Sequence, residues 1–100
     1  MNLDDIVTQL NRRKQRATYG VVAGLVGGLA RGLMQGRPKN NFYSWVVAQT
    51  SRGESRRGWP SGYSSIEVHP DCLSDIRNSP DSFIDDSDML SAWLQAGRPN

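Results

Sequence analysis

Cys72 and His69, three positions apart in the stretch HPDC, are the residues with the most obvious capacity for chemistry. A thiolate and an imidazole can act together as nucleophile and base, or they can bind a metal ion. A structural zinc site needs four ligands of this kind, whereas the chain holds one cysteine and one histidine. A lone cysteine also excludes an intramolecular disulfide. We therefore interpret HPDC as a turn and predict no metal site.

The sequence offers no other catalytic constellation. It has no P-loop, no Ser/His/Asp grouping beyond what its composition supplies, and no carboxylate pair flanked by a pocket signature. We expect a protein that is not an enzyme and that uses no cofactor.

Basic residues that could bind phosphate are concentrated in the first part of the chain. Residues 1–58 hold ten Lys and Arg against three Asp and Glu, whereas residues 59–100 hold two against seven. This division predicts two parts that face different partners, and the basic part is typical of a protein that binds the DNA backbone. The predicted phosphate-binding residues are Arg12, Arg13, Lys14, Arg16, Arg52, Arg56 and Arg57. The alternative interpretation is a solvated basic surface without a partner.

The elements that position these residues depend on TYGVVAGLVGGLARGLMQG, residues 18–36, where every fourth residue from Gly20 to Gly36 is glycine. One continuous helix would align these glycines on one face, as in a glycine zipper or a membrane GxxxG seam. The uncharged run 17–30 is shorter than the ~20 apolar residues of a membrane span. Each glycine also costs a soluble helix ~1 kcal/mol relative to alanine. A continuous helix and a membrane span are therefore both disfavoured.

A break at Gly27–Gly28 resolves the stretch into two short helices. The first is predicted from about Tyr19 to Val26 with Thr18 as its cap, and the second from about Leu29 to Gln35, ending at Gly36. This arrangement has the outline of a helix-turn-helix.

Amphipathic helices are predicted at both ends of the chain. Leu3, Ile6, Val7 and Leu10 follow helical spacing, with Asn2 as a possible cap. A second apolar stripe predicts a helix from about Asp88 to Ala96, and the acidic stretch that begins at His69 is interpreted as an irregular connection.

A β-hairpin is predicted between these helical regions. FYSWVVAQT is aromatic and β-branched, and SRGESRRGWPSG is a loop that leads to a second short strand near Tyr63 to Val68. We predict one mainly α domain with a small β-hairpin, resembling a winged helix-turn-helix. Its parts are a helix-turn-helix half (2–36), a hairpin or wing (42–68), and an acidic connection with a C-terminal helix (69–97).

LDDIVTQLNRRKQ followed by RATYGVVAGLVG resembles the start of the DNA-binding domain of the O6-alkylguanine-DNA alkyltransferases and their non-enzymatic alkyltransferase-like relatives. In that family a basic link leads into a TYG-x-x-A-x-x-x-G helix, and a recognition helix with A-R-x-V-G follows. The matching residues are Thr18, Tyr19, Gly20, Ala23, Gly27, Ala30 and Arg31. The likeness covers about residues 3–63, through SWVVAQTSRG and SGY, and MLSAWLQAG is similar to a later helix of the family.

The resemblance implies a winged helix that binds the DNA minor groove. It implies that Arg31 fills the space left by an extruded base and that Tyr19 helps to rotate the phosphate. Gly28 and Gly32, together with Gly24, would let the helix approach the DNA backbone closely. The alternatives are a core role for Tyr19 and tight packing between the two short helices for the glycines.

The family's alkyl-accepting cysteine lies in a P-C-H-R-V motif that this chain lacks. Alignment on Val46–Val47 places Phe42, Tyr43, Ser44 and Trp45 at the positions of Pro, Cys, His and Arg. Because nucleophile and base are both missing there, we predict no alkyl transfer.

Two functions are compatible with the sequence. The first is a non-enzymatic protein that binds duplex DNA, as a sensor of damaged or flipped bases or as a small regulator. The second is a protein-interaction or inhibitor module of phage or mobile-element type, which docks through its acidic C-terminal part and does not bind DNA. The first sixteen residues have no continuous apolar stretch after a basic start, so we expect a cytoplasmic protein.

Overall fold

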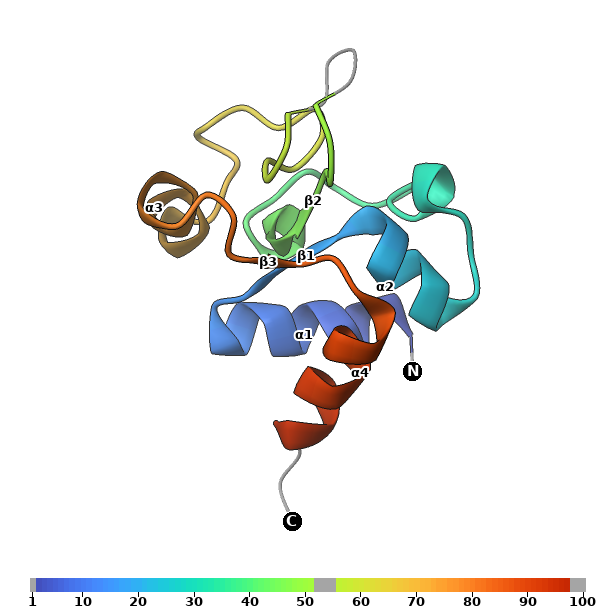
Figure 1. Ribbon diagram of the computed structural model, residues 1–100. Coiled ribbons are helices and arrows are strands. Elements are labelled where there is room, and N and C mark those ends of the chain that lie inside the picture. The colour runs from blue at the N-terminus through green and yellow to red at the C-terminus, as the bar shows by residue number, and fades with distance from the viewer. Residues whose placement is uncertain (1, 52–55, 98–100) are drawn as a thin grey trace.

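The computed structural model describes residues 2–51 and 56–97, except for the side chain of Arg31 (Figure 1). The helices are α1 (Leu3–Arg13), α2 (Tyr19–Val26), α3 (Pro70–Asn78) and α4 (Ser87–Ala96), with 3-10 turns η1 (Ala30–Gly32) and η2 (Phe42–Trp45). The strands are β1 (Arg16–Thr18), β2 (Val46–Val47) and β3 (Phe83–Ile84).

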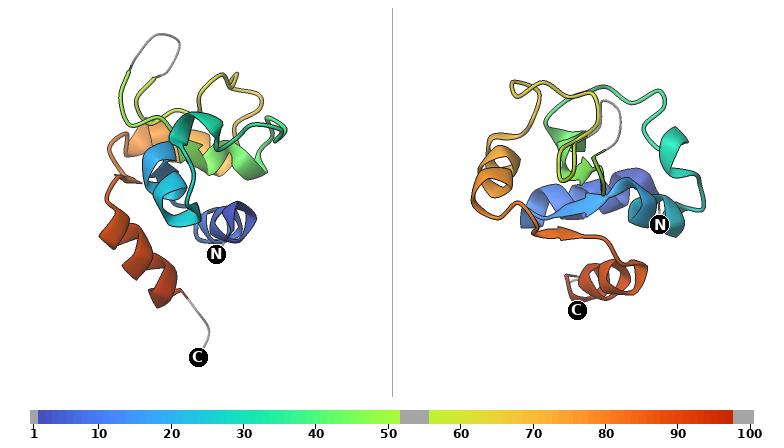
Figure 2. Two further views of the ribbon diagram at one scale, coloured as in Figure 1. Left: turned by 90° about the vertical axis from the view of Figure 1, so that its right-hand side faces the viewer. Right: turned by 45° about the horizontal axis from the view of Figure 1, so that its top comes forward.

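The three strands form one small parallel sheet in the order β2-β1-β3. Ala17 at its centre pairs with Val46 on one side and with Ile84 on the other. Figures 1 and 2 place α3 beyond the start of β1 and α2 beyond its end, so the two helices lie at opposite ends of the strands. The predicted predominance of helix is confirmed, and the strands make the described part of the chain a mixed α/β fold.

The hairpin predicted over residues 42–68 is wrong. Phe42–Trp45 forms η2 in place of a strand, and the described residues from Tyr63 to Val68 contain no strand. The chain does return to β2 at one point, where the Ala48 N–H donates to the Trp59 carbonyl (3.1 Å) and the Ala48 carbonyl accepts from the Gly58 N–H (2.8 Å). These two hydrogen bonds of Ala48 stand in place of the predicted second strand. A winged helix is not seen in the described residues.

The predicted first helix is confirmed with its buried face, and it extends to Arg13. Asn2 and Asp5 form a capping box at its start, and Leu3, Ile6, Val7 and Leu10 are buried. Lys14 adopts a left-handed conformation (φ 58°) that ends α1 and turns the chain into β1. β1, the central strand of the sheet, therefore follows α1 after only two residues, Lys14 and Gln15.

The predicted break at Gly27–Gly28 is confirmed. The Thr18 side chain accepts a hydrogen bond from the Val21 N–H at the start of α2, and Gly27 ends the helix at φ +83°. The second helix predicted over Leu29 to Gln35 is wrong, because only the 3-10 turn η1 forms there. Glycines at positions 28, 32 and 36 favour turns over a regular helix in this segment.

The acidic connection contains an unpredicted helix, α3, and HPDC is its first turn. His69 caps this helix through its side chain, Pro70 takes the first helical position, and Cys72 is buried. The predicted C-terminal helix is confirmed as α4, with Asp86 as its cap.

In the described ranges, no helix is both long and apolar enough to cross a membrane.

Candidate nucleic-acid interface

The glycines of α2 and the following turn are exposed and lie in open space. A Cβ atom placed on Gly20, Gly28 or Gly32 would meet no described atom within 4 Å, and one on Gly24 would lie 3.8 Å from Ser87 Oγ. Tight packing between two short helices therefore does not account for these residues. They leave a stretch of backbone that an external surface can approach closely.

Tyr19 begins α2 and holds a neighbouring loop. Its hydroxyl accepts a hydrogen bond from the Ser61 N–H at 2.8 Å, and burial raises the pKa of its phenol. In the same loop, Trp59 Nε1 donates a hydrogen bond to the Tyr63 carbonyl. The Tyr63 hydroxyl in turn accepts a hydrogen bond from the Asn40 N–H and donates one to the Asn40 carbonyl. Tyr19 thus has a structural task beside any contact with DNA.

Arg31 lies in η1, between Ala30 and Gly32. Its side chain lies outside the described residues, as does all of Arg52. The predictions that concern these two side chains are therefore not tested by the structure.

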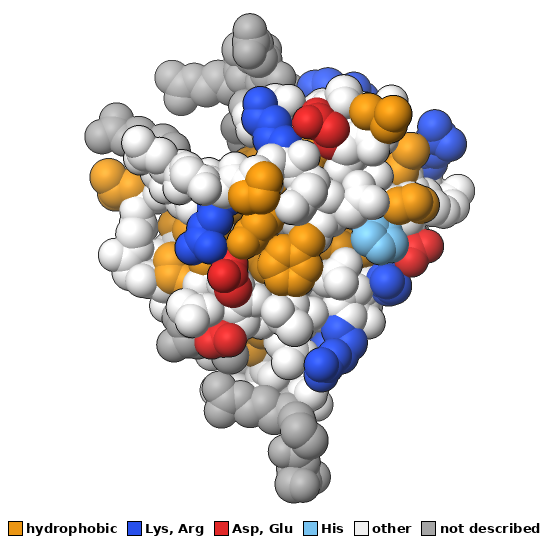
Figure 3. All heavy atoms as spheres, turned by 180° about the vertical axis from the view of Figure 1, so that it is seen from behind, with side chains coloured by type: hydrophobic (Ala, Val, Ile, Leu, Met, Phe, Trp, Pro, Cys, Tyr) orange, Lys and Arg blue, Asp and Glu red, His pale blue; other side chains and the backbone are white. Residues whose placement is uncertain are grey.

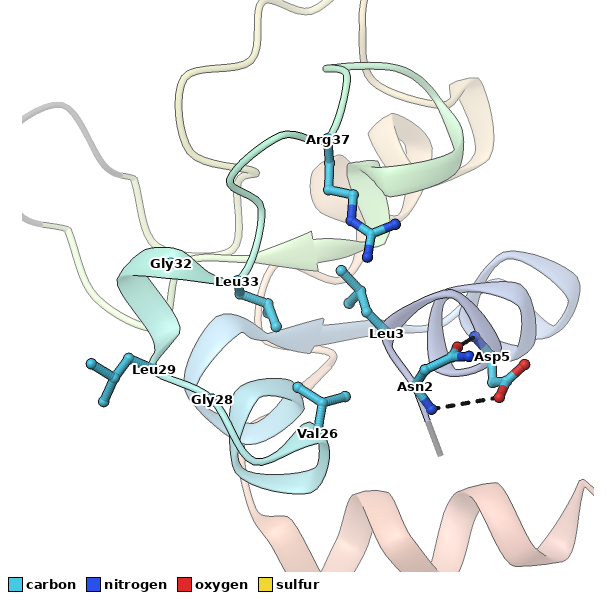
Figure 4. A pocket seen from close by; sticks show the side chains of 9 residues that line it. All are labelled: Asn2, Leu3, Asp5, Val26, Gly28, Leu29, Gly32, Leu33 and Arg37. Carbon is cyan, nitrogen blue, oxygen red and sulfur yellow. Dashed lines mark hydrogen bonds between the residues drawn. The ribbon is translucent and has the colours of Figure 1, made fainter.

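A groove of about 810 Å³ separates η1 from the start of α1 (Figure 4). The side chains of Leu3, Val26 and Leu33 point toward one another inside it, and Gly28 and Gly32 contribute backbone to its wall. Leu29 points away from the groove and is 67% exposed. A hollow with apolar side chains and with the charged side chains of Asp5 and Arg37 thus lies beside the exposed glycines.

Arg16 does not belong to the predicted phosphate-binding set, because its side chain is buried. Its Nε lies 2.9 Å from Asp75 Oδ2, and its two other nitrogens donate to the carbonyls of Gly58 (2.8 Å) and Ser79 (2.7 Å). All three partners are protein groups, so this arginine joins β1 to α3 and to the returning loop. Nothing in the sequence of the basic run 12–16 distinguishes the buried Arg16 from its exposed neighbours.

The acidic part of the chain neutralises cations of the basic part. Lys14 pairs with Asp71 at 3.3 Å, Arg57 pairs with Asp81, and Arg16 pairs with Asp75 as described above. These three ion pairs join the two parts within one molecule, and the prediction that the parts face different partners stays a prediction. Charges summed along the sequence do not reveal such pairs, because ion pairing depends on the positions of the residues in the fold.

The remaining predicted cations differ in their surroundings. The Arg13 guanidinium stacks 3.6 Å from the centre of the Trp93 ring and donates to the Trp93 carbonyl. Arg12 and Arg56 are exposed and have no ion-pair partner among the described residues, and Arg56 lies 4.9 Å from the Trp59 ring. On the face drawn in Figure 3, Lys and Arg side chains are dispersed and form no continuous patch.

Cys72 and His69 have structural roles. The Cys72 thiol donates to the Ser44 carbonyl at 3.5 Å, and burial raises its pKa to about 12. His69 Nδ1 accepts the Asp71 N–H at 3.0 Å, while the His69 N–H donates to Ser44 Oγ. A thiol that stays protonated and buried is not a ready nucleophile. Within residues 2–51 and 56–97, no group of three or more His, Cys, Asp or Glu is placed to hold a metal ion.

Comparisons of the chain with protein-family models, with curated proteins and with solved structures give no match. The resemblance to alkyltransferase DNA-binding domains therefore remains a prediction from short motifs.

Proposed function

We propose that this protein is a non-enzymatic module that binds duplex DNA through the exposed glycine segment of α2 and η1. The observation that carries the proposal is the open space at Gly20, Gly28 and Gly32. Within α2, Gly20 costs roughly 0.5–1 kcal/mol relative to alanine, and no described atom would crowd a Cβ at any of the three positions. Gly28 and Gly32 also favour the turns of this segment, and the backbone that all three glycines leave bare can be approached closely by another surface, such as the phosphate-sugar backbone of DNA.

Exposed cations supply the electrostatic attraction in this proposal. Arg12 and Arg56 are free of ion pairs in the described part of the chain, and Lys14 and Arg57 pair only with exposed carboxylates. Exposed ion pairs contribute only about 0–1 kcal/mol, so phosphate oxygens can replace these carboxylates. Binding of this type weakens steeply as the salt concentration rises.

Recognition of damaged or flipped bases is assigned to Arg31 in this proposal. Its neighbours Ala30 and Gly32 are small, so the turn can approach the minor groove while the arginine enters it. In line with the resemblance, the arginine fills the gap left by an extruded base, and the protein acts as a sensor of damaged or flipped bases or as a small regulator.

The test is anisotropy titration of a labelled duplex, matched or with one mismatch, at several salt concentrations. Arg31→Ala should weaken binding and remove any preference for the mismatch, because extrusion of a weakly paired base costs least. Arg77→Ala is the matched control, since Arg77 is an exposed arginine on α3, which lies at the opposite end of the strands from α2. Wild-type protein that fails to bind duplex at low salt would refute the proposal, and an equal effect of both variants would refute the role of Arg31.

Docking to another protein is a second candidate function, favoured by the groove of Figure 4. Leu3, Val26 and Leu33 line it, and the exposed Leu29 lies beside it. An apolar interface at this position would persist at high salt, whereas phosphate binding would not. Leu29→Ser should weaken such docking and leave the salt dependence of DNA binding unchanged.

A further inference from the structure

An arginine and a tryptophan lie together on the turn that brings the chain back to β2 (Figure 1). The turn spans residues 56–59, and in it the Trp59 N–H donates to the Arg56 carbonyl at 3.0 Å while Gly58 adopts φ +77°. The Arg56 guanidinium lies over the indole of Trp59, with its central carbon 4.9 Å from the centre of the ring. We call this pair of side chains the Arg56–Trp59 platform.

The backbone and the indole of the Arg56–Trp59 platform are held in place by the rest of the protein. Ala48, directly after β2, donates to the Trp59 carbonyl and accepts from the Gly58 N–H. The indole Nε1 of Trp59 donates to the Tyr63 carbonyl at 2.9 Å, which fixes the orientation of the ring. A surface that is already ordered loses little conformational freedom when a ligand binds.

The guanidinium of the Arg56–Trp59 platform is open to a ligand. Arg56 is exposed and pairs with no carboxylate of a described residue, whereas its neighbour Arg57 pairs with Asp81. Because a guanidinium is planar, it can lie between the indole on one side and a second flat group on the other. Nucleobases are flat groups that proteins bind in this way, on aromatic rings and on the planes of arginine side chains.

The rest of this loop suits a negatively charged strand. Lys39 is exposed, has no ion-pair partner in the described part of the chain, and reaches Gly62, where an added Cβ would lie 3.0 Å from Lys39 Nζ. Glu67 is the only acidic residue from position 56 to position 69, and its carboxylate accepts hydrogen bonds from the Ser64 N–H (2.8 Å) and hydroxyl (3.0 Å). The loop thus combines an aromatic ring with two cations that form no ion pair, as surfaces that bind single-stranded nucleic acids do.

We propose that the Arg56–Trp59 platform binds single-stranded nucleic acid, with one unpaired base stacked on the outer face of the guanidinium and with Lys39 in contact with phosphate. A base inside a duplex presents its edges to a protein while its faces are stacked on other bases, so contact of this kind selects unpaired bases. The proposal goes beyond duplex binding by the glycine segment of α2 and η1. It shares only Arg56 with that proposal, in which the residue supplies charge, whereas here it supplies a stacking plane.

The test compares strands that carry the same charge and differ in their bases. The probes are a fluorescent oligodeoxyuridine of about ten nucleotides and an abasic strand of the same length, each titrated with the full chain. We expect the wild-type protein to bind the oligodeoxyuridine about tenfold more tightly, because a stacked base adds affinity while the phosphates act equally in both strands. Oligouridine of the same length decides between DNA and RNA as the source of the strand, and a preference for either agrees with the proposal.

Arg56→Lys separates stacking from charge, since lysine keeps the charge and lacks the plane. This variant should lose the preference for the oligodeoxyuridine and keep the wild-type affinity for the abasic strand. Arg77→Lys is the matched control, because Arg77 is an exposed arginine on α3 whose guanidinium lies over no aromatic ring of a described residue. Trp59→Leu should also abolish the preference, because the guanidinium loses the ring that supports it.

The proposal is refuted if the wild-type protein binds both strands equally or binds neither. It is also refuted if Arg56→Lys retains the preference, or if Arg77→Lys loses it to the same extent. A protein that prefers the oligodeoxyuridine and fails to bind duplex would refute the duplex proposal alone, so the two proposals fail separately. Circular dichroism identifies an unfolded variant, and Arg56→Lys, at an exposed position, decides the question if Trp59→Leu does not fold.

Discussion

The guanidinium of Arg16 on β1 forms an ion pair with the carboxylate of Asp75 on α3, with Nε 2.9 Å from Oδ2. The arginine side chain has no exposed surface, whereas that of Asp75 is 25% exposed. The two residues lie 59 positions apart in the sequence. This pair, with the carbonyls of Gly58 and Ser79, ties three separate segments of the chain together.

Arg16→Ala should therefore destabilise the protein strongly. Removing one partner of a fully buried ion pair costs roughly 3–5 kcal/mol. Because the Asp75 side chain is 25% exposed and water can reach it, we expect a loss near the lower end of that range. The buried carbonyl of Gly58 and the carbonyl of the exposed Ser79 also lose their donor. Urea denaturation should show this loss, and Arg12→Ala on the exposed face of α1 is the matched control. A change in unfolding free energy no greater than that of the control would contradict the assigned role.

Glycines at different positions should respond in opposite ways to alanine. Gly24→Ala should stabilise the protein by up to about 1 kcal/mol, because alanine favours the helix and the new Cβ lies 3.8 Å from Ser87 Oγ. Gly58→Ala should destabilise it, because the residue has φ +77° and its Cβ would lie 2.9 Å from Arg16 Nη1. Thermal unfolding compares the two variants, and a stabilised Gly58→Ala would contradict this expectation.

Local signals in the sequence were sufficient to predict three helices. The apolar spacing of α1 and α4 and the Thr18 cap of α2 act over neighbouring residues, and so does the break at Gly27–Gly28. Such features can be found without knowledge of the tertiary fold.

The parallel sheet could not be predicted, because its strands are only two or three residues long. β1 begins with Arg16, whose charge is compensated by a residue far along the chain, so the strand resembles an exposed basic link. α3 was interpreted as a connection because Pro70 and Asp71 are typical of turns, although they also favour the first turn of a helix. The glycines of the candidate interface can be read from the sequence. Which of its cations are ion-paired cannot, since ion pairing depends on tertiary contacts.

Asp71→Asn should strengthen binding to duplex DNA if the proposed function holds. The substitution frees Lys14, 3.3 Å from the carboxylate, to contact phosphate. Asp85→Asn changes the net charge equally but frees no described cation, so it controls for the general effect of charge. Anisotropy titration at several salt concentrations should show a salt slope steeper by about one unit for Asp71→Asn alone. Identical behaviour of the two variants would remove Lys14 from the interface.

Cys72 should make the stability of the protein fall at alkaline pH. Burial raises the pKa of its thiol from the ordinary 9.0 to about 12, so the folded state retains a proton that the unfolded state releases. Stability from this source is complete below pH 9.0, declines between pH 9.0 and about 12, and is lost above that range. Urea unfolding across this range should show the decline, and Cys72→Ala should lessen it, leaving a smaller contribution from Tyr63, whose pKa is also raised to about 12.

At neutral pH the same burial should protect the thiol, so iodoacetamide should modify Cys72 only in denaturant, and incubation with alkylated DNA should add no mass to the native protein. Rapid stoichiometric modification of Cys72 in the native protein would show that the thiol is accessible and would reopen the question of alkyl transfer.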